Sequence, residues 1–225
     1  MNATIVFSEL QQEPHSGLQF RIGRGAEAPL ARVLLLHGVG GNEDNLASLA
    51  RHLPAGVEVL LVRAPLPLGA QGFAWFQVSF TANGPVIRAE QAEDSRLRLL
   101  RLLDALPPLP TVIAGFSQGG ILSASVGLSA PEKVAGFGLL SGRILPELES
   151  HIAPVEALRS LSAFVGHGRR DDKLPAKWAE LAEAWLQRLG VSHQTRFYEM
   201  GHEIIGEEVA DFIQWLRPTL NLGLD

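Results

Sequence analysis

Short apolar runs that end in glycine-rich turns, each followed by a helical stretch, are the feature that most limits the folds open to this chain. Within each run the side chains are apolar throughout rather than at alternate positions. A strand of this kind is buried on both faces, as in a parallel sheet that helices cover. The predicted strands span residues 31–37, 57–62, 111–116, 134–140, 161–165 and 193–199.

Helical stretches separate these runs, at residues 43–52, 88–106, 119–128, 175–189 and 203–216. Strand and helix in alternation predict an α/β protein with a mostly parallel central sheet and helices on both faces. Residues 4–8 and 18–22 are expected to add an antiparallel pair at one edge. The chain has no repeat, low-complexity tract or linker, so residues 1–225 are expected to form one domain.

The composition excludes several classes of function. The net charge is −5, which leaves no basic stripe to neutralise the phosphates of a nucleic acid. Arg96, Arg98 and Arg101 form the densest basic cluster and are expected to lie on the solvated face of a helix. The chain has no cysteine, so disulfides and thiolate chemistry are excluded. The N-terminus lacks the pattern of a secretory signal and no apolar run is long enough to span a membrane, which predicts a cytoplasmic protein without an integral membrane segment.

Residues 115–119 read Gly-Phe-Ser-Gln-Gly, which fits the G-x-S-x-G pattern of a nucleophilic serine. The pattern alone is weak, but residues 111–114 resemble a strand and residues 119–124 resemble a helix. A strand, a tight turn and a helix are the setting that this motif needs. Ser117 is therefore the predicted nucleophile, and the competing interpretation is a serine that merely caps a helix.

A serine hydroxyl needs a base, and in this architecture the histidine comes last in the chain. Two histidines lie late enough, His193 and His202. His193 falls inside a predicted strand, whereas His202 follows that strand on a turn, so His202 is favoured. Asp171 and Asp172 follow the preceding predicted strand, and the pattern alone leaves the two nearly even as the acid that orients the imidazole.

The oxyanion of an acyl-transfer intermediate needs backbone donors. One is the amide of Gln118, and another is expected from the loop at residues 37–41, which reads His-Gly-Val-Gly-Gly. This loop lacks the Lys-Ser/Thr of a phosphate-binding loop.

Histidines also stand at three strand ends, at positions 37, 167 and 202. They lack the ligand spacing of a metal site, so no metal is predicted.

Residues 73–80 gather aromatic side chains between a strand and a helix, where a polar loop is usual. Phe73, Trp75 and Phe76 either wall an apolar acyl pocket and bind substrate, or form a satellite of the core. The sequence leaves both interpretations open.

Taken together, these segments resemble the phospholipase/carboxylesterase family of α/β-hydrolases, which includes acyl-protein thioesterases and small bacterial carboxylesterases. The combination of Gly-Phe-Ser-Gln-Gly-Gly with a late Gly-His-Glu is far rarer than G-x-S-x-G. The matching segments occur in family order, at residues 36–41, 64–65, 74–76, 115–120, 167–175 and 201–203.

The resemblance implies an α/β-hydrolase fold and an enzyme that cleaves carboxylic esters or thioesters without a cofactor. It favours Asp171 over Asp172 as the acid, and it places the second oxyanion donor at Val39. The short stretch after the fourth predicted strand favours an open site for small or monoacyl substrates.

Two alternatives stay open. A catalytically idle binding protein on the same scaffold has the same fold, because fold alone does not establish function. Amide or acyltransferase substrates need the same three side chains. The oligomeric state is also open, since the apolar tail at residues 220–224 can pack on its own domain or on a partner.

Overall fold

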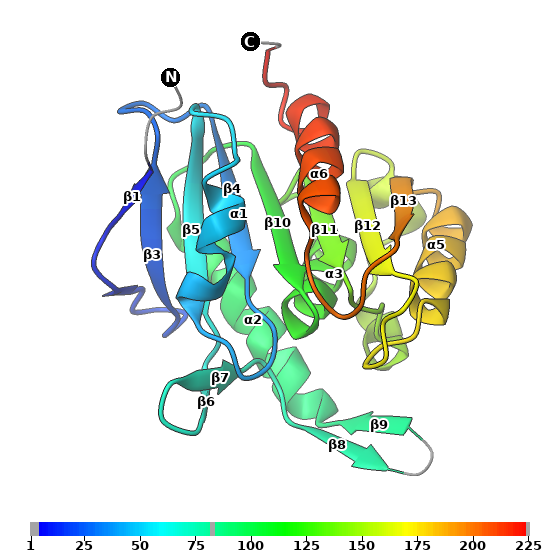
Figure 1. Ribbon diagram of the computed structural model, residues 1–225. Helices are drawn as coiled ribbons and strands as arrows, with labels where there is room; N and C mark the ends of the chain where they lie inside the picture. Colours follow the sequence, from blue (N-terminus) through cyan, green and yellow to red (C-terminus); the bar gives the residue numbers. More distant parts are fainter. Residues whose placement is uncertain (1–4, 82–83, 224–225) are drawn as a thin grey trace.

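A nine-stranded sheet forms the centre of the computed structural model, which describes residues 5–81 and 84–223 (Figure 1). Strands β5, β4, β10, β11, β12 and β13 run parallel, and β3 joins β5 in the antiparallel sense. Along the sheet the strands are β1 (Val6–Phe7), β3 (Gln19–Arg24), β5 (Val57–Arg63), β4 (Ala31–Leu36), β10 (Thr111–Phe116), β11 (Gly136–Leu140), β12 (Ser162–Gly168) and β13 (Ser192–Tyr198), with β2 (Gln11–Gln12) beside β3.

The predicted α/β class and the mostly parallel sheet are confirmed. All six predicted parallel strands form, and their ends differ from the predicted ones by at most three residues. The antiparallel N-terminal pair is also present as β1 and β3, although Thr4, where the first of these was predicted to begin, lies outside the described residues.

Helices cover both faces of the sheet. One core packs α2, α3 and α5 against it, and the other packs α1 and α6 (Figure 1). The helices are α1 (Ala47–Ala50), α2 (Ala89–Ala105), α3 (Gln118–Ser129), α4 (Val155–Leu158), α5 (Lys177–Leu189) and α6 (Gly206–Thr219), with short 3₁₀ helices η1 (Glu43–Leu46) and η2 (Pro146–His151).

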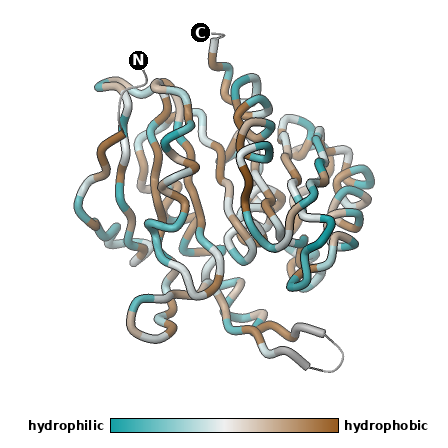
Figure 2. Tube along the Cα trace, in the orientation of Figure 1, coloured by the Kyte–Doolittle hydropathy of each residue, from teal (hydrophilic) through white to brown (hydrophobic). Residues whose placement is uncertain are grey.

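The central strands are apolar on both faces because each face meets helices. Leu34 on β4 lies opposite Leu60 on β5 and Ile113 on β10, and all three side chains are fully buried. Figure 2 shows the same pattern as a hydrophobic centre, with hydrophilic residues on the outer sides of the helices. Burial on both faces explains why these runs lack alternation in the sequence.

Two segments differ from the sequence-based expectation. The helix predicted at residues 43–52 is instead a 3₁₀ turn followed by one turn of α1. Here Asn42 and Asn45 cap the turn reciprocally, with Oδ1 of Asn45 accepting from the amide of Asn42 at 2.6 Å. The aromatic stretch forms parts of two hairpins that the sequence did not predict, β6–β7 (Leu66–Leu68, Gly72–Ala74) and β8–β9 (Val78–Thr81, Gly84–Ile87).

The prediction of a solvated basic face on α2 is wrong for Arg96. This side chain is buried between α2 and α3, where its Nη2 lies 2.6 Å from Oε1 of Glu93 and its Nη1 donates to Oγ of Ser129 at 2.9 Å. Arg98 is half-buried and pairs with Asp94 at 2.7 Å. Arginine reaches such partners because its long apolar stem can lie along a helix interface.

The apolar C-terminal segment packs on its own chain. Leu220 is buried in the core beneath α6, and Leu222 packs against the same core. Leu224 lies outside the described residues. Among the described helices, none combines the length and the apolar character needed to cross a bilayer.

Phe212 anchors α6 to the sheet and offers a test of this core. Its ring is fully buried, 5.7 Å from the ring of Phe164 and 5.6 Å from that of Trp215. We expect Phe212→Ala to lower the free energy of unfolding by about 3–5 kcal/mol, measured by urea titration. Leu181→Ala on the exposed side of α5 is the control and should cost less than about 0.5 kcal/mol. Equal losses in both variants would contradict the assignment of Phe212 to the core.

Candidate active site

Three side chains predicted from the sequence come together beyond the carboxyl ends of the parallel strands. Oγ of Ser117 lies 3.0 Å from Nε2 of His202, and Nδ1 of His202 lies 2.7 Å from Oδ2 of Asp171. Ser117 follows β10, Asp171 follows β12 and His202 follows β13. Ligands in open parallel sheets bind at this edge.

Ser117 occupies a strained turn between β10 and α3. Its φ of 54° and ψ of −117° are unusual for a residue with a side chain. The turn requires glycine nearby, because a Cβ at Gly119 would lie 2.0 Å from the carbonyl oxygen of Leu36, and one at Gly115 would lie 2.4 Å from the carbonyl carbon of Gly119. The amide of Ser117 donates to the carbonyl of Leu140 at 2.8 Å, which fixes the turn to the neighbouring strand.

The carboxylate of Asp171 is held by its own loop. Its Oδ1 accepts hydrogen bonds from the amides of Lys173 and Leu174, at 2.9 and 2.8 Å, which leaves Oδ2 for His202. Nε2 of His167 bonds the carbonyl of Leu174 at 2.7 Å and lies 3.4 Å from Oδ2. Burial lowers the pKa of His167, so this imidazole is neutral and serves to anchor the acid loop.

The neighbouring candidates lie elsewhere. The side chain of Asp172 is exposed and pairs with Lys173 at 3.2 Å. His193 lies on the edge strand β13, and its Nδ1 bonds the carbonyl of Val191 just before that strand. The structure thus separates Asp171 from Asp172, which the residue pattern alone left nearly even.

The loop at residues 37–41 brings the amide of Val39 to the same edge as that of Gln118. Neither amide has a hydrogen-bond acceptor among the described residues. His37 sets this loop: its Nε2 accepts from the amide of Ala64 at 3.0 Å, so its Nδ1 carries the proton and donates to the carbonyl of Gly38 at 2.7 Å. Burial lowers the pKa of His37, which keeps it neutral.

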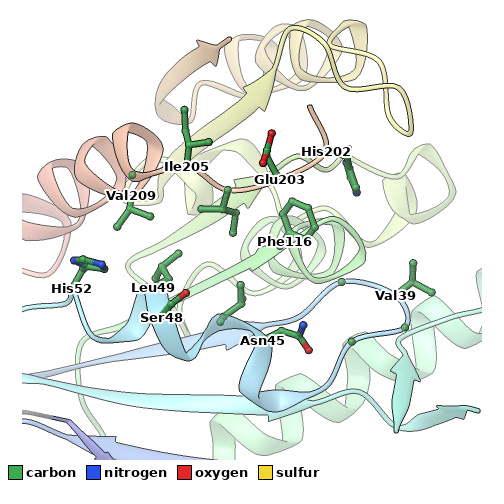
Figure 3. A pocket seen from close by; sticks show the side chains of 16 residues that line it. Val39, Asn45, Ser48, Leu49, His52, Phe116, His202, Glu203, Ile205 and Val209 are labelled. Carbon is green, nitrogen blue, oxygen red and sulfur yellow. The ribbon is translucent and has the colours of Figure 1, made fainter. Parts of the chain in front are cut away.

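Two hollows lie beside Ser117 and His202, and Val39 and His202 border both. The smaller hollow, about 290 Å³, reaches Ser117 and Gln118 and is walled mainly by apolar side chains. The larger, about 610 Å³, is a groove between α1 and α6, with Val39 and His202 at one end and His52 at the other (Figure 3). Its floor is apolar and its rim is polar, formed by Asn45, Ser48, His52 and Glu203.

Comparison with known proteins identifies the family. A model of the phospholipase/carboxylesterase family matches residues 19–220. The chain belongs to this family. It is accordingly a hydrolase of the esterase and thioesterase type, as the sequence resemblance predicted.

Relatives and solved structures agree with this family assignment. The chain is 27% identical to acyl-protein thioesterase 1 of Gibberella zeae over 84% of this chain and 91% of that protein. It is also 27% identical to a probable carboxylesterase of Oryza sativa subsp. japonica, over 90% and 94% of the two chains. The crystal structure of Zea mays acyl-protein thioesterase 2 superposes with a TM-score of 0.79 at 21% identity, over 89% and 98% of the chains, and shows the shared fold.

The structure does not bring Phe73, Trp75 and Phe76, the predicted substrate-binding aromatics, to either hollow. Trp75 and Phe76 are fully buried in the core, and the half-buried Phe73 packs beside it. A large aromatic ring gains most from complete burial, which the core offers and an open pocket does not.

These aromatic residues hold the loop at residues 37–41 and the turn at Ser117 together. Nε1 of Trp75 donates to the carbonyl of His37 at 2.9 Å, and Phe73 exchanges backbone hydrogen bonds with residues 40 and 41. Oε1 of Gln118 accepts from the amide of Trp75, and its Nε2 donates to the carbonyl of Phe76. Sequence reasoning missed this role of the Gln118 side chain, although the family pairing of its motif with Ala-Trp-Phe was the available signal.

A buried acid lies on α6, the helix that follows His202 in the chain. Glu208, on the first turn of α6, is fully buried, and neither carboxyl oxygen has a partner among the described residues. It faces β12 at Gly166, where a Cβ would lie 2.1 Å from Oε1 of Glu208. Burial raises the pKa of Glu208 to about 8.

Among the described residues, no cluster of three or more acids and histidines is placed to hold a metal ion.

Glu208 predicts a pH-dependent stability. From its ordinary pKa of 4.5 up to about 8, the folded chain keeps a proton that the unfolded chain releases, so the stability falls as the pH rises through this window. Glu208→Gln removes the titration. We expect the melting temperature of the variant relative to wild type to rise between pH 5 and pH 8. Parallel melting curves across this range would contradict the prediction.

Proposed function

We propose that this chain hydrolyses carboxylic esters or thioesters of small or monoacyl substrates, with Ser117 as nucleophile, His202 as general base and Asp171 as the acid that orients it. The observation that carries the proposal is the continuous relay from Ser117 through His202 to Asp171, at 3.0 and 2.7 Å, on a strained serine turn. Family membership supports the same chemistry.

The steps follow from the positions of these groups. Oγ of Ser117 bonds the carbonyl carbon while its proton passes to Nε2 of His202, and the resulting oxyanion faces the amides of Val39 and Gln118. The leaving oxygen or sulfur takes the proton from Nε2 as its bond breaks. Water then gives a proton to Nε2 and attacks the acyl-enzyme, and release of the acid returns that proton to Oγ.

The two hollows suggest how the substrate lies. The smaller one touches Ser117 and Gln118, so we assign it to the acyl group. The leaving atom must meet Nε2 of His202, which borders the groove between α1 and α6, so we assign that groove to the alcohol or thiol part. The ridge formed by Val39 and His202 would then lie beneath the bond that breaks.

Hydrolysis of p-nitrophenyl esters over a series of acyl lengths tests the proposal. Wild type should show its highest kcat/KM with short chains, because the acyl hollow is only about 290 Å³. Ser117→Ala should abolish turnover, and a fluorophosphonate probe should label wild type alone. If wild type neither turned over an ester nor bound the probe, the idle binding protein would become the better explanation.

The two adjacent aspartates give a matched pair of variants. Asp171→Asn should lower kcat by ~10³–10⁴, because the amide no longer holds the tautomer of His202 that the base needs. Asp172→Asn changes an exposed neighbour and should leave kcat within about twofold of wild type. Comparable losses in both variants would overturn the assignment of the acid.

A further inference from the structure

Arg143 borders the smaller hollow with its guanidinium largely unpaired. The residue is only 6% exposed, yet none of its N–H groups donates a hydrogen bond to a described residue. Its sole ion-pair partner there is Glu147, at 3.9 Å, and its Cζ lies 4.8 Å from the ring centre of Trp178. Burial lowers the pKa of Arg143, which reflects a charge that the protein itself does little to compensate.

A guanidinium that is shielded from most of the solvent and donates no hydrogen bond to the described residues can gain from a ligand in the hollow that provides acceptors. Its planar array of donors matches a carboxylate, which can accept two parallel hydrogen bonds. The other groups around the hollow are compatible with an anion: no Asp or Glu is among the ten lining residues, and Lys173, whose ammonium pairs with Asp172, lies at the rim. The wall is otherwise apolar, formed by Val39, Val78, Ile87, Ile121 and Leu174.

The groove between α1 and α6, on the other side of His202, differs from the smaller hollow in the charge of its lining residues. Glu203 is its only carboxylate, and no Lys or Arg lines it. An anionic group therefore fits the acyl hollow and not the groove. A short methylene chain that ends in a carboxylate would place its apolar part against the wall and its charge against Arg143.

We propose that the acyl hollow is built for acyl groups that carry a second carboxylate, so that the preferred substrates are monoesters or monothioesters of short dicarboxylic acids. Arg143 is the specificity-determining residue. This inference rests on the proposed esterase function, and it adds the chemical class of the acyl group.

The test compares esters of equal chain length with and without the distal charge. Monoethyl glutarate is paired with ethyl pentanoate and monoethyl adipate with ethyl hexanoate, and the released acid is titrated at constant pH. Wild type should favour the anionic member of a pair at least tenfold in kcat/KM. Arg143→Met should lower this ratio at least tenfold, whereas Arg143→Lys should keep part of it.

Arg188→Met is the matched control, because Arg188 also stacks on a tryptophan, at 4.7 Å from Trp185, but is exposed on α5 outside the hollow. It should leave the ratio unchanged. A preference of wild type for the neutral esters, or a ratio that Arg143→Met does not alter, would overturn the inference.

A measurement on wild type alone avoids any effect of the substitutions on folding. Glutarate should inhibit hydrolysis of ethyl hexanoate competitively with a Ki at least tenfold below that of pentanoate, and added salt should weaken this inhibition. Equal Ki values would overturn the inference while ethyl hexanoate hydrolysis leaves the esterase function standing. If no ester were hydrolysed and the fluorophosphonate probe did not react, the proposed function would fail and this inference with it.

Discussion

The geometry of the site depends on the close approach of two backbone segments, the start of α3 and the end of β4. Helix α3 begins so near to β4 that a single methyl group at Gly119 would lie 2.0 Å from the carbonyl oxygen of Leu36. The close approach accompanies a sharp turn at Ser117, whose φ is 54°, between β10 and α3. The conformational strain at such a serine, on the order of 1–3 kcal/mol, is sustained by the buried strand β10 before the turn and the buried helix α3 after it.

Neutral hydrogen bonds, rather than ion pairs, position the groups around the serine. His37 and His167 are both buried, and burial lowers the pKa of each. The ring of His37 bonds the carbonyl of Gly38, and the ring of His167 bonds the carbonyl of Leu174, so each imidazole stabilises the loop that follows it. Gln118 and Trp75 join the turn at Ser117 to the loop at residues 37–41 in the same way. Such contacts change little with ionic strength, because they involve no net charge. The charges at the site are thereby left to Asp171 and to the walls of the acyl hollow.

Local signals predicted the parallel strands and the positions of Ser117 and His202, whereas they left Asp171 and Asp172 nearly even and only the family resemblance favoured Asp171. Apolar runs between glycine turns mark buried strands, and Ser117, Asp171 and His202 each follow such a run. The two hairpins and the buried position of Trp75 were not accessible in this way, because an aromatic stretch gives the same pattern whether it faces a pocket or the core. Arg143 escaped notice for a related reason: whether an arginine is paired depends on residues that meet only in the fold.

Ser117, Asp171 and His202 follow the ends of three separate strands, and the last of these, β13, is the final strand among the described residues. No fragment that stops short of β13 contains His202. Under the proposed mechanism, a chain in which β13 has not yet joined the sheet would hold Ser117 without His202 beside it. Hydrolysis would then depend on completion of this edge of the sheet, and its onset would mark that step of folding.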